Sequence, residues 1–160
     1  MTTAQSASLQ MLLETAERAR DDAVADLERA ARQLDDAQRQ AQALQNYTRD
    51  YENRWQTQFR QSGGVEIMRC YRDFMLRLSD AVSAQDAKVA HARVAQQHCQ
   101  AALLERERKV AAIAQLLERR HAEWMRAQAR QEQKATDELA ARQFRASPWG
   151  ADAGGSPKAS

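Results

Sequence analysis

Gln61-Ser62-Gly63-Gly64 is the stretch that decides the fold, because it contains the only glycines before residue 150. Neither Gly nor Pro occurs in residues 1–62 before this pair or in residues 65–147 after it, so both segments lack the residues that most oppose helix. Two glycines tolerate positive φ, which ends one helix and redirects the chain into the next. We therefore predict an all-α fold: two long helices, at about residues 6–61 and 66–146, form an antiparallel coiled-coil hairpin hinged at the glycine pair.

The composition is that of a coiled coil. Ala, Glu, Lys, Leu and Arg supply about half of the 160 residues, whereas Leu, Ile, Val and Phe together number only 24, which is little for a globular core. The 24 basic and 22 acidic side chains nearly cancel, so the net charge of +2 gives no electrostatic reason to expect a nucleic-acid partner.

Apolar residues recur in steps of four and three on both sides of the glycine pair. Such a seven-residue repeat is typical of a left-handed coiled coil. The second seam includes the polar residues Gln85, Gln96, Arg106 and Arg120, which help to specify register. The first seam reads Leu9, Leu13, Ala16, Arg20, Ala23, Leu27, Ala30, Leu34, Ala37, Ala41, Leu44, Thr48, Tyr51 and Trp55. The second runs from Tyr71 through Met75, Leu78, Val82, Gln85, Val89, Ala92, Gln96, Cys99 and Leu103 to Gln131.

A hinge at the glycine pair also predicts the register, since the numbers of antiparallel partners then add up to about 125. The second helix is the longer one, so residues beyond about 121 lack a partner in the hairpin and must stay exposed, fray or dock into another protein. Ser147-Pro148 ends the helical pattern. We expect residues 1–147 to form the hairpin and residues 148–160 to be a disordered tail.

The side chains become larger toward the hinge, from Ala and Leu to Tyr47, Tyr51, Trp55 and Phe59. Two interpretations are open. Either these rings fill the wider space where two helices separate at a turn, or part of the cluster is exposed as a docking surface, where binding energy concentrates.

The sequence offers no catalytic motif, and we expect a non-enzyme without metal or cofactor. His91 and His98 lie about 10.5 Å apart along a helix, too far to share an ion, and Cys99 belongs to the seam. Cys70 and Cys99 are too distant on one helix to pair. The absence of an h-region and of any long apolar run predicts a cytoplasmic protein that does not insert into a membrane.

The chain resembles the flagellar FliJ family, the small coiled-coil component of the flagellar type III export apparatus. The blocks that carry the resemblance are Leu12-Leu13 with Ala16-Glu17 and Asp21-Asp22-Ala23; Leu44-Gln45-Asn46-Tyr47 with Tyr51; Tyr71-Arg72-Asp73-Phe74 with Leu78, Ala81-Val82 and Gln85; and Glu132-Gln133-Lys134 with Asp137-Glu138. The last block, before a final basic helical turn, is the most specific.

The resemblance implies a stalk-like coiled coil that promotes assembly and activity of the hexameric export ATPase and links it to the cytoplasmic domain of the export gate. It also implies a cytoplasmic protein that associates with the inner membrane through the export apparatus, with the ATPase regulator and export chaperones as further partners. The positions implied to bind the gate are Gln40, Leu44, Tyr47, Tyr51, Phe74, Leu78, Ala81 and Gln85. Contact with the ATPase ring is expected at Glu132, Gln133, Lys134, Asp137 and Glu138.

Three alternatives remain at this point. The stalk of a virulence type III secretion system shares the architecture but usually lacks the last block. A homodimeric coiled-coil scaffold would pair the same seams between chains. A nucleic-acid binder would show a steep salt dependence, which the net charge does not favour.

Overall fold

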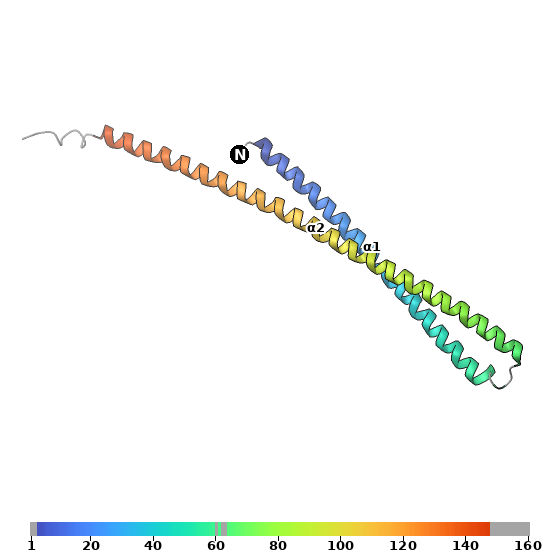
Figure 1. Cartoon of the computed structure of the whole chain (residues 1–160). Helices are drawn as coiled ribbons and strands as arrows, with labels where there is room; N and C mark the ends of the chain where they lie inside the picture. Colours follow the sequence, from blue (N-terminus) through green and yellow to red (C-terminus); the bar gives the residue numbers. More distant parts are fainter. Residues whose placement is uncertain (1–2, 60, 62–63, 148–160) are drawn as a thin grey trace, which may run out of the picture. The chain divides into compact units, whose positions relative to one another are not determined.

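The computed structural model describes residues 3–59, 61 and 64–147. It contains two long α-helices, α1 (Thr3–Arg54) and α2 (Val65–Ala146), and a single π-helical turn, η1 (Trp55–Phe59), that continues α1. No strand occurs in the described ranges, and α1 and α2 run in opposite directions on either side of the turn (Figure 1). The predicted all-α helical hairpin is confirmed. Gly63 and the predicted tail at residues 148–160, with Trp149, lie outside the described residues.

The chain divides into two units, which we describe separately. One unit is Leu13–Ala111, which contains the turn, and the other consists of Met1–Leu12 together with Ala112–Ser160. Both long helices contribute to both units.

In the unit Leu13–Ala111 the predicted seams are the least exposed positions of the two helices. Every α1 seam residue from Leu13 to Trp55 is buried or half-buried, and so is every α2 seam residue from Tyr71 to Leu103, whereas Arg106 is exposed. The heptad pattern therefore identified the packed faces correctly.

Alanine occupies the core of this unit away from the turn. Ala16, Ala23 and Ala30 are buried at seven-residue intervals, followed by Leu34; we call these four residues the alanine shaft. Because the methyl group of alanine takes little space, the two helices can pack closely at the three alanine positions.

Gln85 lies in the seam between the alanine shaft and the turn, and only 7% of its surface is exposed. Its Nε2 donates hydrogen bonds to the Ala37 carbonyl at 2.9 Å and to Gln40 Oε1 at 3.3 Å, both on α1. These bonds satisfy the buried amide, whose desolvation would otherwise be costly. In the described part of the chain, no buried side-chain polar atom lacks a partner.

At the turn, α2 starts differently from the expectation. Gly64 has no positive φ; its carbonyl instead accepts hydrogen bonds from the amides of Ile67 at 3.1 Å and Met68 at 3.3 Å, so Gly64 occupies the position just before the helix. The α-helical geometry of α1 also ends at Arg54, before residue 61, and η1 follows. Within η1 the Thr57 hydroxyl donates to the Asn53 carbonyl at 2.9 Å. The turn is thus approached through a π-helical segment, a form often found at functional sites.

In the unit of residues 3–12 and 112–147, the half-buried positions of α2 all come before Glu118. Leu9 on α1 is half-buried, as are Ile113 and Leu117 on α2. Every residue from Glu118 to Ala146 is exposed and helical. The segment predicted to lack a partner in the hairpin is therefore exposed, and it keeps its helical geometry.

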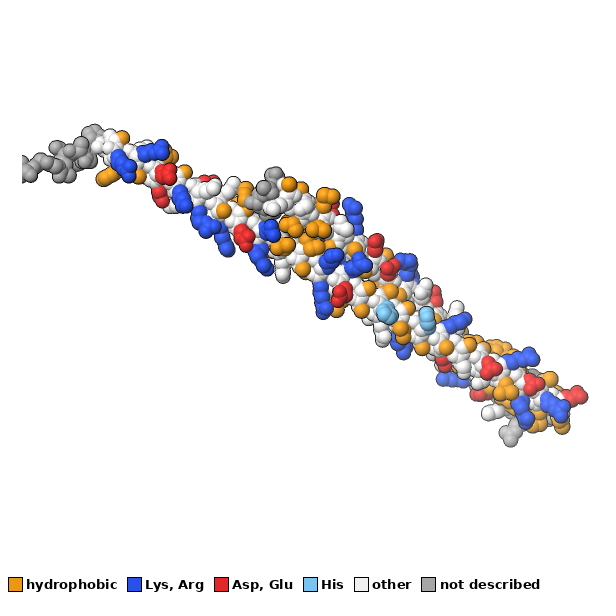
Figure 2. Space-filling model, turned by 45° about the horizontal axis from the view of Figure 1, so that its top comes forward, with side chains coloured by type: hydrophobic (Ala, Val, Ile, Leu, Met, Phe, Trp, Pro, Cys, Tyr) orange, Lys and Arg blue, Asp and Glu red, His pale blue; other side chains and the backbone are white. Residues whose placement is uncertain are grey.

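Charged side chains of both signs alternate over the visible surface (Figure 2). The four ion pairs among the described residues all lie in α1: Glu14–Arg18, Arg20–Asp21, Asp26–Arg29 and Asp35–Arg39. Apart from the half-buried Arg20, the paired side chains are exposed, and such pairs contribute little to stability. Neither α1 nor α2, over the described residues, has a stretch apolar enough to cross a bilayer.

Candidate interaction surface at the hairpin tip

Five aromatic side chains pack together next to the turn, in the unit Leu13–Ala111. We call Tyr47, Tyr51, Trp55, Tyr71 and Phe74 the aromatic tip. The Trp55 and Tyr71 rings stack with centroids 4.1 Å apart and planes 13° from parallel, and Tyr51 and Phe74 approach to 4.4 Å. Tyr51 also stacks on Tyr71 at 5.8 Å. Rings at these separations stabilise one another beyond their buried area. The side chain of Phe59, also expected in this cluster, lies outside the described part.

The contacts at the tip agree with the predicted register. Tyr51 meets Phe74, and Gln40 meets Gln85, as expected for partners whose numbers add up to about 125. Tyr47 lies 6.4 Å from Phe74, edge to face. Five of the eight positions that the resemblance assigns to the gate, Gln40, Tyr47, Tyr51, Phe74 and Gln85, are therefore joined by direct contacts between the two helices.

These eight positions differ in how much surface they offer. Tyr47 is 51% exposed, and Gln40 and Ala81 are exposed as well. Leu44, Tyr51 and Phe74 are half-buried. Leu78 and Gln85, in contrast, are each only 7% exposed because they fill the seam. The first six residues therefore present surface to solvent, whereas Leu78 and Gln85 lie within the seam.

Two open hollows adjoin the Trp55–Tyr71 stack, and both are lined by these two rings. One, of about 430 Å³, is completed by Met68, Arg72, Met75 and Leu76. The other, of about 330 Å³, is completed by Tyr51, Glu66, Ile67 and Cys70, whose thiol is free. The rings of the aromatic tip thus fill space between the helices, and part of their surface remains accessible beside the two hollows.

Sequence reasoning missed the apolar residues that flank the tip on α2. Val65, Ile67, Met68 and Leu76 are all exposed. The signal was present, since bulky apolar residues that follow directly on a turn and lie off the seam have no partner in a two-helix hairpin.

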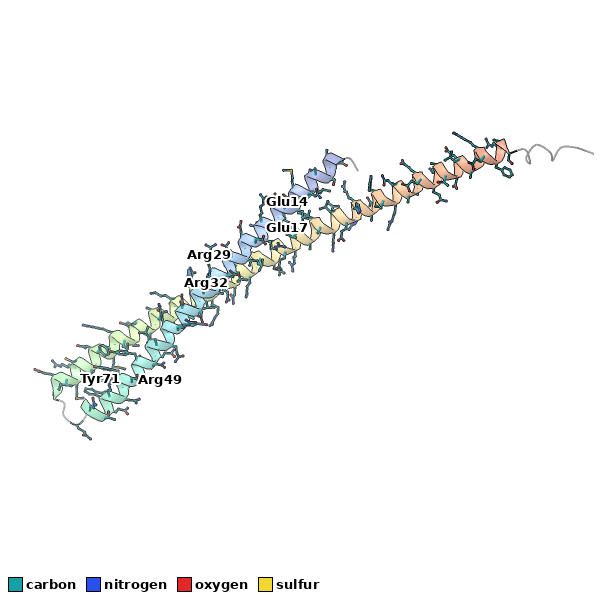
Figure 3. All side chains as sticks on the ribbon, turned by 180° about the vertical axis from the view of Figure 1, so that it is seen from behind. Glu14, Glu17, Arg29, Arg32, Arg49 and Tyr71 are labelled. Carbon is teal, nitrogen blue, oxygen red and sulfur yellow. The ribbon has the colours of Figure 1, made fainter. Side chains whose placement is uncertain are left out.

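Tyr71 lies between the two helices near the turn (Figure 3). Burial raises the pKa of its phenol, and the negative charges of Glu52 and of ionised Tyr51 raise it further. The fold therefore favours the neutral form of the Tyr71 phenol.

No group of three or more His, Cys, Asp and Glu side chains that could hold a metal ion occurs among the described residues. His91 and His98 are exposed and Cys99 is half-buried in its seam. The tip presents rings and apolar side chains, which suit binding of another protein.

The residues expected at the ATPase ring, Glu132, Gln133, Lys134, Asp137 and Glu138, are all exposed on the helical segment after Leu117. Earlier on the same helical segment, the rings of His121 and Trp124 lie 6.0 Å apart. Trp124 also lines a hollow of about 300 Å³, together with Gln5, Arg120, Glu123 and Ala127.

Comparison with known protein families gives one match, to the family described as Flagellar FliJ protein, over residues 5–148. This range covers both long helices and the turn. The chain belongs to the FliJ family. No curated protein and no solved structure matches it.

Membership of the FliJ family makes the chain a component of the flagellar export apparatus, and this family consists of non-enzymatic export components. It favours the flagellar system over the virulence secretion stalk. The helical hairpin and its heptad seams agree with a coiled-coil FliJ protein, and Leu13–Ala111 packs its seams within one chain.

Proposed function

We propose that this FliJ-family protein is the stalk of the flagellar export ATPase, promoting ring assembly and ATP hydrolysis and linking the ring to the export gate. The observation that carries the proposal is the exposed helical segment from Glu118 to Ala146, which buries no side chain. A helix of nearly thirty exposed residues is poorly stabilised by itself and gains most from a partner that surrounds it. The interior of a hexameric ring would provide such a partner.

Within this segment, Glu132, Gln133, Lys134, Asp137 and Glu138 are proposed to contact the ring. Their mixed charges favour polar, orientation-specific contacts over hydrophobic burial. The apolar side chains of Leu139 and Phe144, which are exposed nearby, would add desolvated anchor points.

The aromatic tip is proposed to contact the cytoplasmic domain of the export gate. Exposed Tyr47, Gln40 and Ala81 border the half-buried rings of Tyr51 and Phe74, so one partner surface meets both polar and aromatic groups. Tyr is favoured at protein interfaces because it buries a large area and keeps a polar hydroxyl. In this position the protein would work on the cytoplasmic side of the inner membrane, within reach of the ATPase regulator and export chaperones.

The ring contact is tested by ATP hydrolysis of the cognate export ATPase, titrated with the full chain. Stimulation should saturate at about one chain per six ATPase subunits and should disappear when residues 121–147 are deleted. Substitution of Glu132 and Asp137 by Lys should weaken stimulation, whereas the same change at Glu105 and Glu107, which are exposed outside this segment, should leave it intact. Saturation at one chain per subunit would contradict the stalk proposal.

The gate contact is tested by titrating the gate's cytoplasmic domain with tip variants. Tyr47→Ala should weaken binding about tenfold, because an exposed interface tyrosine is often a major anchor. The double change Tyr51→Ala with Phe74→Ala should abolish binding while helicity measured by circular dichroism is retained. Leu76→Ala, a similarly exposed apolar residue outside the eight positions, is the matched control. Equal affinity of the Tyr47 and Leu76 variants would remove the tip from the proposed gate contact.

A further inference from the structure

A second surface at the turn is independent of the proposed gate contact. It is the hollow of about 430 Å³ lined by Met68, Arg72, Met75 and Leu76, with the Trp55 and Tyr71 rings at its base. We call the four α2 residues the methionine flank. Met68 is 54% and Leu76 60% exposed, so substantial apolar surface faces solvent here. None of the four belongs to the positions assigned to the gate.

Helical geometry separates the methionine flank from those positions. With 100° of rotation per residue, Met68, Arg72 and Leu76 fall on one side of the α2 seam, with Met75 at that edge of the seam itself, while Phe74 and Ala81 fall on the other side. The smaller hollow, lined by Ile67 and Cys70, lies on the side of Phe74. The hairpin thus offers two distinct binding sides, and a molecule on the methionine flank leaves Tyr47 free.

Charge indicates what the methionine flank would accept. Arg72 lines the hollow, and Arg69 lies one turn before it on the same face. Within the described ranges neither guanidinium forms an ion pair. Glu52 on α1 acts electrostatically on the phenol of Tyr71, whose ring also lines the hollow. Two unpaired arginines beside exposed apolar groups favour a ligand with a carboxylate next to an apolar surface.

The spacing of the methionines favours a helical ligand. Met68 and Met75 are seven residues apart, about 10.5 Å along α2, which equals two turns of a helix laid alongside. Methionine side chains are flexible and polarisable, so they adapt to apolar side chains of different shape and recur where proteins grip amphipathic helices.

We propose that the methionine flank binds an amphipathic helix of another protein, which seats its apolar residues against Met68, Met75 and Leu76 and pairs an acidic residue with Arg72. A second copy of this chain is a poor occupant. In a two-fold contact the same surface faces itself, which would bring Arg69 and Arg72 of one copy against those of the other.

The test is selection of helical peptides on the full-length chain. The probe is a displayed library of 18-residue peptides with Leu at heptad positions a and d and with Glu, Lys, Gln or Ala at all others. The retained pool should be enriched in Glu over Lys beside the leucines. A retained peptide should lose about tenfold in affinity for Leu76→Ala and for Met68→Ala, and Arg72→Glu should reverse the preference from Glu to Lys.

Matched controls locate the binding. Val94→Ala removes a comparably exposed apolar side chain elsewhere on α2, and Tyr47→Ala alters the proposed gate surface; neither should change peptide affinity. Since Met68, Arg72 and Leu76 are exposed, their variants should keep the helicity of the wild type. The peptide affinities test the methionine flank whether or not the export gate binds Tyr47.

Several results would overturn the proposal. They are a library from which no peptide is retained, a pool without charge preference, and binding that is insensitive to Leu76 and Arg72. Sedimentation that shows a dimer dissociated by Leu76→Ala would assign the methionine flank to a second copy.

Discussion

The alanine shaft and the aromatic tip solve the same packing problem in opposite ways. Ala16, Ala23 and Ala30 are buried because small side chains let the opposite helix cover them. None of the five tip rings is buried, although Tyr51, Trp55 and Tyr71 are the largest side chains in the seam, because large rings leave faces and edges accessible. The difference shows that one heptad repeat supports two kinds of packing: small residues make a closed seam, and large residues make a more open one whose surface stays partly accessible.

The largest effect is expected from making the shaft resemble the tip. Ala23→Phe inserts a ring where the structure leaves no space, and we expect a loss of about 3 kcal/mol in unfolding free energy because the helices must separate. Denaturant unfolding followed by circular dichroism measures it. Ala25→Phe, on the exposed face one half-turn away, should change stability by less than about 0.5 kcal/mol. Equal losses at both sites would refute the closed seam.

The next effect comes from making the tip resemble the shaft. Trp55→Ala removes the ring stacked on Tyr71 and should cost about 2 kcal/mol, less than for a fully buried Trp because Trp55 is half-buried. The loss should be local. Amide hydrogen exchange should accelerate in residues 51–59 and 65–75 and stay unchanged around Ala23. Uniform acceleration along α1 would mean that tip and shaft open as one unit.

A smaller effect is expected where the two regions meet. Gln85→Ala deletes the bonds to Ala37 and Gln40 and should lower stability by about 1 kcal/mol. Gln85→Leu should be nearly neutral, because apolar packing replaces the lost polar contacts. Comparing the two in thermal unfolding separates packing from hydrogen bonding. A Leu variant as unstable as the Ala variant would show that the hydrogen bonds, and not the volume, hold this junction.

The smallest effect is a dependence on pH at the tip. Because the pKa of Tyr71 is raised above its usual value of about 10, the neutral phenol is favoured by the fold. Its contribution to stability is complete below about pH 10 and is lost as the pH rises through the raised pKa. Ultraviolet titration of the phenols should show one ionising later than free tyrosine, and Tyr71→Phe should remove that step.

The packed faces of the two helices and their register were predictable from the sequence. The heptads from Leu13 to Trp55 predicted the packed face because helical periodicity is local, and the glycine pair fixed the register because antiparallel partners are counted from the turn. The contacts Tyr51–Phe74 and Gln40–Gln85 follow from that count.

Other features depend on packing across the seam and were not predictable. Whether a ring next to the turn is covered depends on the ring opposite, so the hollows beside Trp55 and Tyr71 emerge only when both helices are placed. The same reason explains why Leu78 and Gln85, assigned to a partner surface from the resemblance, are buried. The π-helical turn at Trp55–Phe59 has no distinctive residue pattern, and the heptad periodicity did not predict it.

The exposed part of α2 after Leu117 has a kinetic consequence. Starting a helix is slow and unfavourable because several residues must be ordered before the first hydrogen bond forms, but extending one adds a bond for each residue fixed. Ile113 and Leu117, in the turns of α2 just before the segment, are half-buried, so the nucleus for the segment already exists. Residues 118–146 therefore only elongate a helix that is already formed, and melting should begin from Ala146 inward. A partner that closes around Glu132 to Glu138 would meet a surface ordered in advance, with little conformational entropy left to lose.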